Sequence, residues 1–230
     1  GAMTLGEVMQ AALDPGALKA FNDAPRYLRE SSLFPYNDGL TFVGALITRG
    51  GYDAVNAAFK DPPASTEQVL HPAKYLSHEQ PIAVTLLPGI ATKLGPGWSL
   101  ASEDTLGELV LRIWLEQVVS TPDAAAAAAG WGGDRLALLR GPNGAVALAL
   151  RTEWDTAADA DAFLAAATQT KTGLALPASL EHHQLAERRD LGRAGVALQL
   201  ERKDRLRRFE QLDRLPVDRA QRLAHLGERL

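Results

Sequence analysis

The sequence predicts an α+β protein with a helical N-terminal part, followed by a four-stranded antiparallel sheet built from two hairpin-plus-helix units. Three observations predict this class. The first 129 residues carry apolar side chains at helical spacing between helix-ending glycines and prolines. Residues 131–168 hold two alternating stretches around a Gly-Pro-Asn-Gly turn and then an amphipathic helix, and residues 193–230 repeat this order. Because one hairpin alone is marginal, we expect both to share a sheet that two helices cover.

Composition excludes several classes of protein. With 230 residues, 46% hydrophobic and 23% charged, the chain suits one large or two small globular domains. The net charge of −4 argues against wholesale electrostatic binding to nucleic acid. The absence of cysteine excludes disulfides, thiolate metal sites and cysteine nucleophiles. No apolar run approaches the ~20 residues of a membrane-spanning helix, so we expect a soluble protein. The cytoplasm is slightly favoured, and secretion of a longer parent protein stays open.

The chain divides near residue 130, where helical spacing gives way to alternating stretches. Residues 1–3, Gly-Ala-Met, are typical of a cleavage and cloning remnant and are left out of the fold. We expect a mainly helical region over residues 4–129 and a ββαββα sheet module over residues 130–230. The glycine-rich stretch 130–133 is too short for a flexible linker, so the two regions should adjoin.

Helix signals begin at once. Residues 4–22 have one apolar face and restart at Asp14-Pro15, where an N-cap precedes a proline at the first helical position. Pro35 predicts the start of a helix that runs to about residue 48, and Gly50-Gly51 predicts its end. Another helix is expected over residues 52–59.

The middle of the chain mixes element types. Ser65 and Gln68 have the spacing of a capping box, which predicts a short helix that His71-Pro72 ends. The brief β-branched stretch 82–87 predicts a strand, and the Gly- and Pro-rich residues 88–97 a loop. Two further helices are expected, one capped by Ser102 with Glu103 and Asp104 in its first turn, and one from Thr121 through six alanines to Gly130.

The sheet module follows. Strands are expected at 135–140 and 145–152, with a helix over 156–168. The second unit has an alternating strand at 194–201, a turn at Lys203-Asp204, a return strand at 205–212 and a helix from Pro216.

Candidate chemistry is sparse. None of the five histidines has the spacing of a zinc-peptidase helix, and no serine lies in a nucleophile elbow. Glu67 and His71 lie four apart, so a carboxylate could orient the imidazole; the favoured interpretation is that His71 caps the helix end before Pro72. Basic side chains crowd the C-terminal hairpin and form a candidate surface for an anionic partner, for which a solvated hairpin is the favoured explanation: Arg202, Arg205, Arg207 and Arg208.

Two stretches resemble a known family. Residues 24–43 read Ala-Pro-Arg-Tyr-Leu-Arg-Glu-Ser-x-Leu-Phe-Pro-Tyr-x-x-Gly-x-x-Phe-Val, and residues 62–75 read Pro-Pro-x-Ser-Thr-Glu-Gln-Val-Leu-His-Pro-x-Lys-Tyr. With Leu-Gly-Pro-Gly-Trp at 94–98, Asp-Thr-Leu-Gly-Glu at 104–108 and Gly-Trp-Gly-Gly-Asp-Arg at 130–135, they resemble the region downstream of the active site in bacterial gluzincin-type zinc metallopeptidases. The resemblance extends over about residues 24–165, and the last 60 residues share only the order of elements.

The resemblance implies ancestry without an active site. In that family an H-E-x-x-H helix and a downstream glutamate bind zinc before this region, and this chain holds neither. No catalytic, cofactor-binding or metal-binding residue therefore carries over, and zinc is expected only if the full protein includes the upstream segment. The family's arrangement places six residues in a candidate cleft that faces the missing half: Tyr36, Ser65, Glu67, Gln68, His71 and Tyr75.

Together these observations predict a non-catalytic C-terminal portion of a metallopeptidase-like protein, whether a fragment or a pseudoenzyme. It would act as a scaffold, a substrate-recognition module or a protein-interaction module, and its partner would be its own upstream catalytic segment or another protein. Enzyme activity of this chain alone is not expected. Two alternatives stay open: a hydrolase with an unrecognised site around Glu67, His71 and Tyr75, and a nucleic-acid-associated protein that uses the Arg-rich hairpin.

Overall fold

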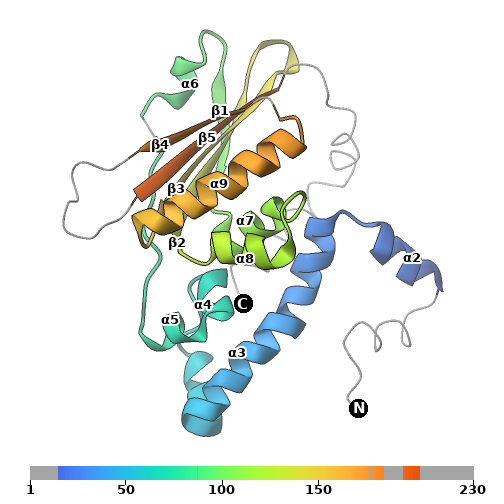
Figure 1. Cartoon of the computed structure of the whole chain (residues 1–230), viewed down its shortest axis with the longest axis vertical. Helices are drawn as coiled ribbons and strands as arrows, with labels where there is room; N and C mark the ends of the chain where they lie inside the picture. Colours follow the sequence, from blue (N-terminus) through green and yellow to red (C-terminus); the bar gives the residue numbers. More distant parts are fainter. Residues whose placement is uncertain (1–14, 87, 177, 184–193, 203–230) are drawn as a thin grey trace.

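The computed structural model describes residues 15–86, 88–176, 178–183 and 194–202, and it places a helical N-terminal part beside an antiparallel sheet (Figure 1). The predicted mixture of helix and sheet, with helices first, is confirmed. The predicted number of four strands is wrong, because the described residues form five, in the order β1-β2-β3-β5-β4. The physical reason is that two strands, β1 and β4, come from stretches without a clear alternating pattern.

The N-terminal part is dominated by one long helix. After α2 (Pro15–Asp23), α3 runs over Arg26–Ala58 with Pro35 inside it, so the predicted start at Pro35 is wrong. A proline inside a helix costs about 3 kcal/mol, and burial of Phe42 and Leu46 on the same helix offsets this cost. The predicted break at Gly50-Gly51 is confirmed, since both residues have non-helical backbone angles and Gly51 has a φ of 64°.

A chain of short elements connects α3 to the sheet. Helices α4 (Thr66–Leu70) and α5 (Pro72–Leu76) meet at His71, and α6 (Ile90–Lys93) follows. The predicted strand at 82–87 is wrong for residues 82–86, which are irregular, and residue 87 lies outside the described residues. This stretch contacts the sheet without forming a ladder: the Ile82 N–H donates to the Gly132 carbonyl at 2.7 Å, and the Arg151 guanidinium donates to the Thr85 carbonyl at 2.9 Å. Its β-branched composition reflects packing against the sheet face.

The predicted helix after Ser102 is present, but its predicted cap and first turn are wrong. Residues Ser99–Asp104 form the edge strand β1, and helix α7 begins only at Gly107 and ends at Leu115. The physical reason is a distant cap: the Asp134 carboxylate accepts hydrogen bonds from the N–H groups of Leu106 (2.7 Å) and Gly107 (2.8 Å). Residues Glu103 and Asp104 are therefore strand residues.

The first hairpin-plus-helix unit forms as predicted. Strands β2 (Trp131–Arg140) and β3 (Val146–Trp154) pair in register around η1 (Pro142–Gly144). Helix α9 (Ala157–Gly173) follows, with Thr156 as its N-cap. The preceding alanine-rich helix, α8, covers Thr121–Ala128 and is capped by Ser120.

The second unit differs from its prediction. Strand β5 (Ala194–Arg202) confirms the predicted strand at 194–201, but β3 pairs with one of its edges and β4 (Ala178–His183) with the other. The predicted turn at Lys203-Asp204, the return strand 205–212 and the helix from Pro216 lie outside the described residues. Because β3 and β4 are each antiparallel to β5, they run in the same direction, and the chain connects them through helix α9.

The sheet has a different covering on each face. On one face lie α7, α8 and α9, where the buried side chains of Leu115, Trp131, Trp154 and Phe163 form the main core (Figure 1). On the other face, Leu86, Ile90 and Trp98 from the segment around α6 pack on a small cluster that includes Ala137 and Leu139. Within the described part of the chain, no helix is long and apolar enough to span a membrane.

Candidate functional site

The candidate site is centred on α4, the helix that the sequence singled out. The Ser65 hydroxyl accepts a hydrogen bond from the Gln68 N–H at 3.3 Å, as predicted for its cap. The return bond goes one residue further than expected, because the Gln68 side-chain carbonyl accepts from the N–H of Ala64 at 2.6 Å. The cap turns Glu67 inward, and only 2% of this residue is exposed.

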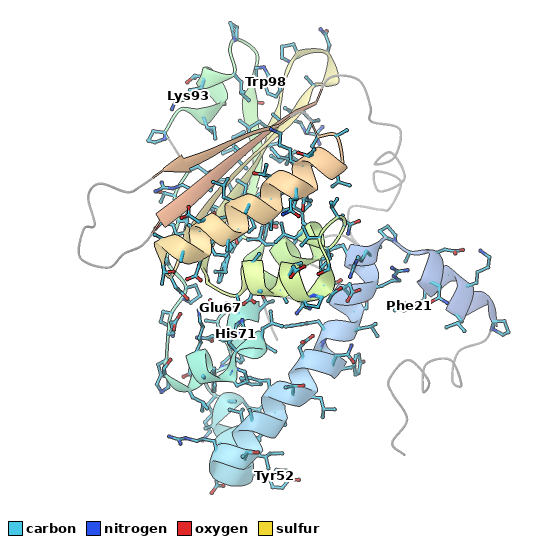
Figure 2. The ribbon with its side chains drawn as sticks, viewed as in Figure 1. Phe21, Tyr52, Glu67, His71, Lys93 and Trp98 are labelled. Carbon is cyan, nitrogen blue, oxygen red and sulfur yellow. The ribbon has the colours of Figure 1, made fainter. Side chains whose placement is uncertain are left out.

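A lysine lies among three carboxylates beside this helix. The Lys74 ammonium contacts a Glu67 oxygen at 2.5 Å, a Glu79 oxygen at 3.2 Å, and Asp155, which follows strand β3. Figure 2 labels Glu67 and His71 between the sheet and the long helix, where this cluster lies. We call these four residues the lysine cage. It ties α4 and α5 to the end of a central strand.

The charges of the lysine cage do not balance, since one ammonium faces three carboxyl groups. Burial, with smaller contributions from the neighbouring Asp155 and Glu108, raises the pKa of Glu67 to about 7 against the opposing effect of Lys74. Burial also disfavours the charged form of Lys74, yet its hydrogen bonds to Asp155 and Glu67 outweigh this and raise the pKa of the amine. The cage therefore keeps its lysine charged and binds a proton readily at Glu67.

The same carboxylates are the described residues nearest to a metal-binding geometry, with ligand oxygens of Glu67, Glu79 and Asp155 within 4.8 Å of one another. They do not fit zinc, which in proteins takes mainly histidine and cysteine ligands. The ammonium of Lys74 supplies the positive charge that a cation would bring. The lysine cage is thus complete as an internal ion-pair cluster.

His71 interacts with a different carboxylate from the one expected. Its Nε2 lies 2.9 Å from Oε1 of Glu108 on α7, whereas the expected partner Glu67 binds Lys74. About a third of the His71 side chain, 34%, is exposed, but Glu108 is 2% exposed and its Oε2 has no hydrogen-bond partner. His71 also ends α4, so the predicted position at the helix end and an oriented imidazole occur together.

The pKa values of His71 and Glu108 are both raised, for different reasons. The hydrogen bond and charge of Glu108 raise the pKa of His71, while burial opposes them. Burial raises the pKa of Glu108, against the effect of His71. Both groups therefore hold protons at a higher pH than in the unfolded chain.

A second cluster fixes the position of Glu108. Asp134 on β2 binds the first N–H groups of α7, and its Oδ2 also accepts a hydrogen bond from the Trp131 indole at 2.9 Å. The Thr66 hydroxyl, on α4, accepts from the Leu109 N–H at 3.3 Å. Strand, helix α7 and helix α4 are thereby held in one arrangement around the His71–Glu108 pair.

The two other predicted cleft residues, Tyr75 and Tyr36, lie in different surroundings. Tyr75 packs its ring edge-on against Phe42 with centroids 5.1 Å apart, and its hydroxyl donates to the Asp61 carbonyl at 2.8 Å. Tyr36 lies on α3 and is 65% exposed. The structure therefore brings Ser65, Glu67, Gln68, His71 and Tyr75 together on α4 and α5, while Tyr36 belongs to an exposed helix surface. Of the candidate basic surface, Arg202 ends β5, and Arg205, Arg207 and Arg208 lie outside the described residues.

Sequence reasoning missed four members of the site, namely Lys74, Glu79, Glu108 and Asp155. Lys74 lies seven residues after Glu67, but the helix break at His71-Pro72 lies between them, so helical spacing does not predict their contact. Glu108 and Asp155 join through contacts between residues 37 and 81 positions apart, which no local pattern encodes.

Comparison with known proteins adds one finding. Residues 98–210 match the model of a family described as a domain of unknown function (DUF8575). The match begins just before β1, so it covers the sheet and its helices and leaves α3, α4 and α5 outside. No curated protein matches the chain. No solved structure matches it either.

Proposed function

We propose that this chain is a non-catalytic portion of a metallopeptidase-like protein, and that it acts as a recognition and scaffold module. The resemblance of residues 24–76 to the region downstream of the gluzincin active site supports the ancestry. The lysine cage at α4 and α5, whose charged groups bind one another, supports the absence of catalytic activity.

The observation that carries the proposal is the position of Lys74. A general acid or base must exchange a proton with a substrate within hydrogen-bond reach. In the lysine cage the ammonium binds Glu67, Glu79 and Asp155, and Glu67 is buried. The two cavities described along the chain are lined by other residues, between 81 and 135. The cage therefore links elements: its two partly exposed carboxylates, Glu79 and Asp155, both form ion pairs with Lys74.

Exposed apolar side chains on α3 support the interaction role. Tyr36, Leu40 and Ile47 lie at spacings of four and seven residues, so they share one face of the helix, and Leu40 is 71% exposed. Beyond the Gly50-Gly51 break, Tyr52 and Phe59 are exposed as well, and Figure 2 shows Tyr52 at the far end of the helix. Such apolar patches are typical of protein-binding surfaces.

The test is a combined assay of metal content and peptide cleavage on the purified chain. We expect no stoichiometric zinc and no turnover of casein or of a mixed peptide library. Stoichiometric zinc together with turnover would overturn the proposal. The variant Lys74→Met tests whether the lysine suppresses a catalytic site that the carboxylates would otherwise form. It removes the ammonium from the three carboxylates without changing the apolar core of the fold.

A second candidate function rests on the His71–Glu108 pair. An imidazole that is oriented by a buried carboxylate and is partly exposed can act as a general base. The discriminating measurement is hydrolysis of activated esters by the wild-type chain and by His71→Ala. Activity that disappears in His71→Ala favours the hydrolase, and equal rates exclude it.

The nucleic-acid alternative concerns residues beyond the described part of the chain, apart from Arg202. It stays a prediction. Binding of DNA with a steep salt dependence, lost in an Arg205, Arg207 and Arg208 triple variant, would support it.

A further inference from the structure

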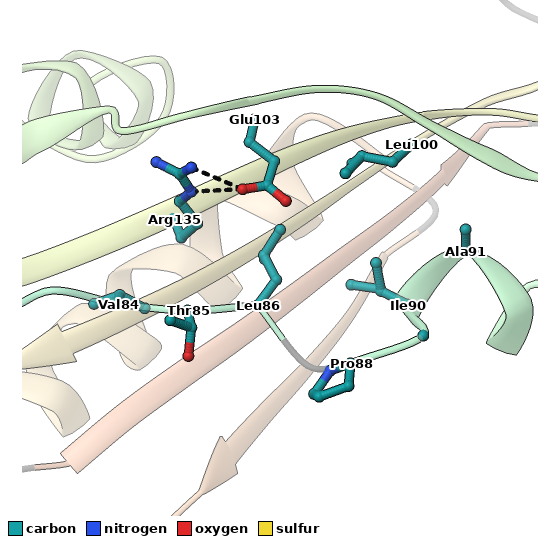
Figure 3. A pocket seen from close by; sticks show the side chains of 10 residues that line it. Val84, Thr85, Leu86, Pro88, Ile90, Ala91, Leu100, Glu103 and Arg135 are labelled. Carbon is teal, nitrogen blue, oxygen red and sulfur yellow. Dashed lines mark hydrogen bonds and ion pairs between the residues drawn. The ribbon is translucent and has the colours of Figure 1, made fainter.

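A cavity of about 500 Å³ lies on the sheet face that α6 covers, between the segment 84–91 and strands β1 and β2. Its walls are mainly apolar, with Leu86 and Ile90 on one side and Leu100 on the other (Figure 3). This volume falls within the ~300–1,000 Å³ typical of ligand sites. The cavity is separate from the lysine cage and from the His71–Glu108 pair.

One ion pair supplies its polar groups. Arg135 donates from Nε at 2.9 Å and from Nη2 at 2.7 Å to the same oxygen of Glu103, Oε2. The other carboxylate oxygen of Glu103 has no partner among the described residues, and Figure 3 shows it directed between Leu86 and Leu100. The rim of this apolar cavity thus carries one free acceptor oxygen, on a carboxylate that is paired with Arg135 through its other oxygen.

The cavity adjoins an open edge of the sheet. Within the described part of the chain, strand β1 is the first of the five strands and pairs only with β2, and all six of its residues are exposed. An edge strand presents unpaired N–H and C=O groups to which an extended chain can bind. A register shift between Leu100 and Ser102 lets Leu100 and Glu103 point to the same face, toward the cavity.

We propose that β1 and this cavity bind a short extended peptide that has an apolar residue with basic residues two positions before and after it. The peptide backbone adds to β1, and the apolar side chain enters the cavity between Leu86 and Leu100. Because alternate residues of a strand share a face, the two flanking basic side chains lie on the same side as the apolar one, about 13 Å apart along the strand. Whichever direction the peptide takes, one of them lies beside Glu103. Such a peptide would be the ligand of the proposed recognition module, so this proposal rests on the proposed function.

Charge supports a basic partner and argues against self-pairing. β1 carries Glu103 and Asp104, and Arg135 neutralises only the first. Two copies of this strand would therefore repel one another, as edge strands with like charges do. A peptide with lysine or arginine reverses that repulsion and gains an ion pair with the free oxygen of Glu103.

The experiment measures peptide binding by calorimetry on the full chain. The probe is the acetylated and amidated heptapeptide Thr-Lys-Thr-Leu-Thr-Lys-Thr. Three controls accompany it: the same peptide with alternate amides N-methylated, the version with glutamate in place of lysine, and acetyl-leucine amide. We expect the first two controls to bind at least about tenfold more weakly and the third not at all, since backbone pairing, charge and cavity act together.

Variants locate the site. Leu100→Trp, which fills the cavity from an exposed position, should weaken binding about tenfold or more, and Glu103→Gln should weaken binding of the lysine peptide only. Leu174→Trp, a change at an exposed leucine that follows α9, is the matched control and should leave binding unchanged. Circular dichroism of each variant checks the fold.

Two outcomes would overturn the inference. Equal binding of the N-methylated peptide would show that the β1 edge is not used, and equal binding of acetyl-leucine amide would show a small-molecule pocket. Chromatography of the recovered peptide separates this inference from the proposed function. A peptide that binds as expected but is returned cleaved contradicts the non-catalytic role and leaves the binding site intact, whereas an intact peptide that never bound contradicts the site alone.

Discussion

The Nε2 atom of His71 lies 2.9 Å from Oε1 of Glu108, and this contact joins the end of α4 to the first turn of α7. The carboxylate is buried, and its other oxygen is unpaired, so the imidazole is its one polar partner among the described residues. The stability of this junction therefore depends on the protonation states of His71 and Glu108, and so on pH.

Stability should fall as the pH rises from about 5 to 8. The pKa of Glu67 is raised to about 7 from 4.5, and those of His71 and Glu108 are raised from 6.5 and 4.5, so the folded chain binds more protons than the unfolded chain in this window. Groups with raised pKa values contribute stability that is present at low pH and lost as the pH passes their folded values. Urea denaturation should give a higher midpoint at pH 5.5 than at pH 8.0. Glu67→Gln should flatten the difference; a higher midpoint at pH 8.0 in the wild-type chain contradicts this account.

Removal of the caged lysine should be costly. Lys74→Met leaves Glu67, Glu79 and Asp155 facing one another, and loss of one partner from a largely buried ion pair costs about 3 kcal/mol. Thermal unfolding measures the loss, and Lys93→Met, at an exposed lysine on α6, is the control with little expected change.

The same variant should respond to divalent cations. Three carboxylate oxygens within 4.8 Å of one another can hold a hard cation such as Ca²⁺ once the ammonium has gone. Millimolar Ca²⁺ should raise the melting temperature of Lys74→Met and leave that of the wild-type chain unchanged. An equal effect on both proteins would mean that Ca²⁺ acts elsewhere.

Asp134 should matter more than any other helix cap described along the chain. Asp134→Ala leaves the Leu106 and Gly107 N–H groups and the Trp131 indole without their acceptor, which we expect to cost about 3 kcal/mol. Chemical denaturation provides the measurement. Asp53→Ala on the surface of α3 should change stability by less than about 0.5 kcal/mol.

Two glycines should respond oppositely to alanine. A Cβ on Gly133 would lie 2.3 Å from the Ile82 carbonyl oxygen, so Gly133→Ala should destabilise the fold by about 1–3 kcal/mol. A Cβ on Gly44 would meet nothing within 4 Å inside α3, so Gly44→Ala should stabilise it by about 0.5–1 kcal/mol. Similar melting temperatures for both variants would show that the segment around Ile82 yields easily.

Local signals predicted the elements whose ends are decided by nearby atoms. The break at Gly50-Gly51 depends on glycine's own backbone freedom, and the hairpin around η1 depends on its turn residues. The cap at Ser65 binds a group three residues away. In each case the stabilising group lies within the same short stretch of sequence.

Distant partners decided the rest. Ser102 with Glu103 and Asp104 has a sufficient helix-start pattern, yet Asp134 accepts from Gly107 across 27 residues and moves the start of α7. The site has the same origin, because His71 pairs with Glu108 in place of the nearer Glu67, and Lys74 adds the distant Asp155 to its nearer partners. Sequence spacing placed the candidate residues on α4 and α5, but tertiary contacts chose their partners.

The position of β5 has a consequence for the order in which the sheet assembles. Among the described strands, β4 pairs only with β5, and β5 lies between β4 and β3. β4 therefore has no edge to join until β5 has docked, although it comes earlier in the chain. The nascent polypeptide must hold β4 unpaired after α9 until β5 emerges, or add the two as a preformed hairpin. Either route makes this edge of the sheet the last to form, and pulse-labelled hydrogen exchange should find its amides protected after those of β2 and β3.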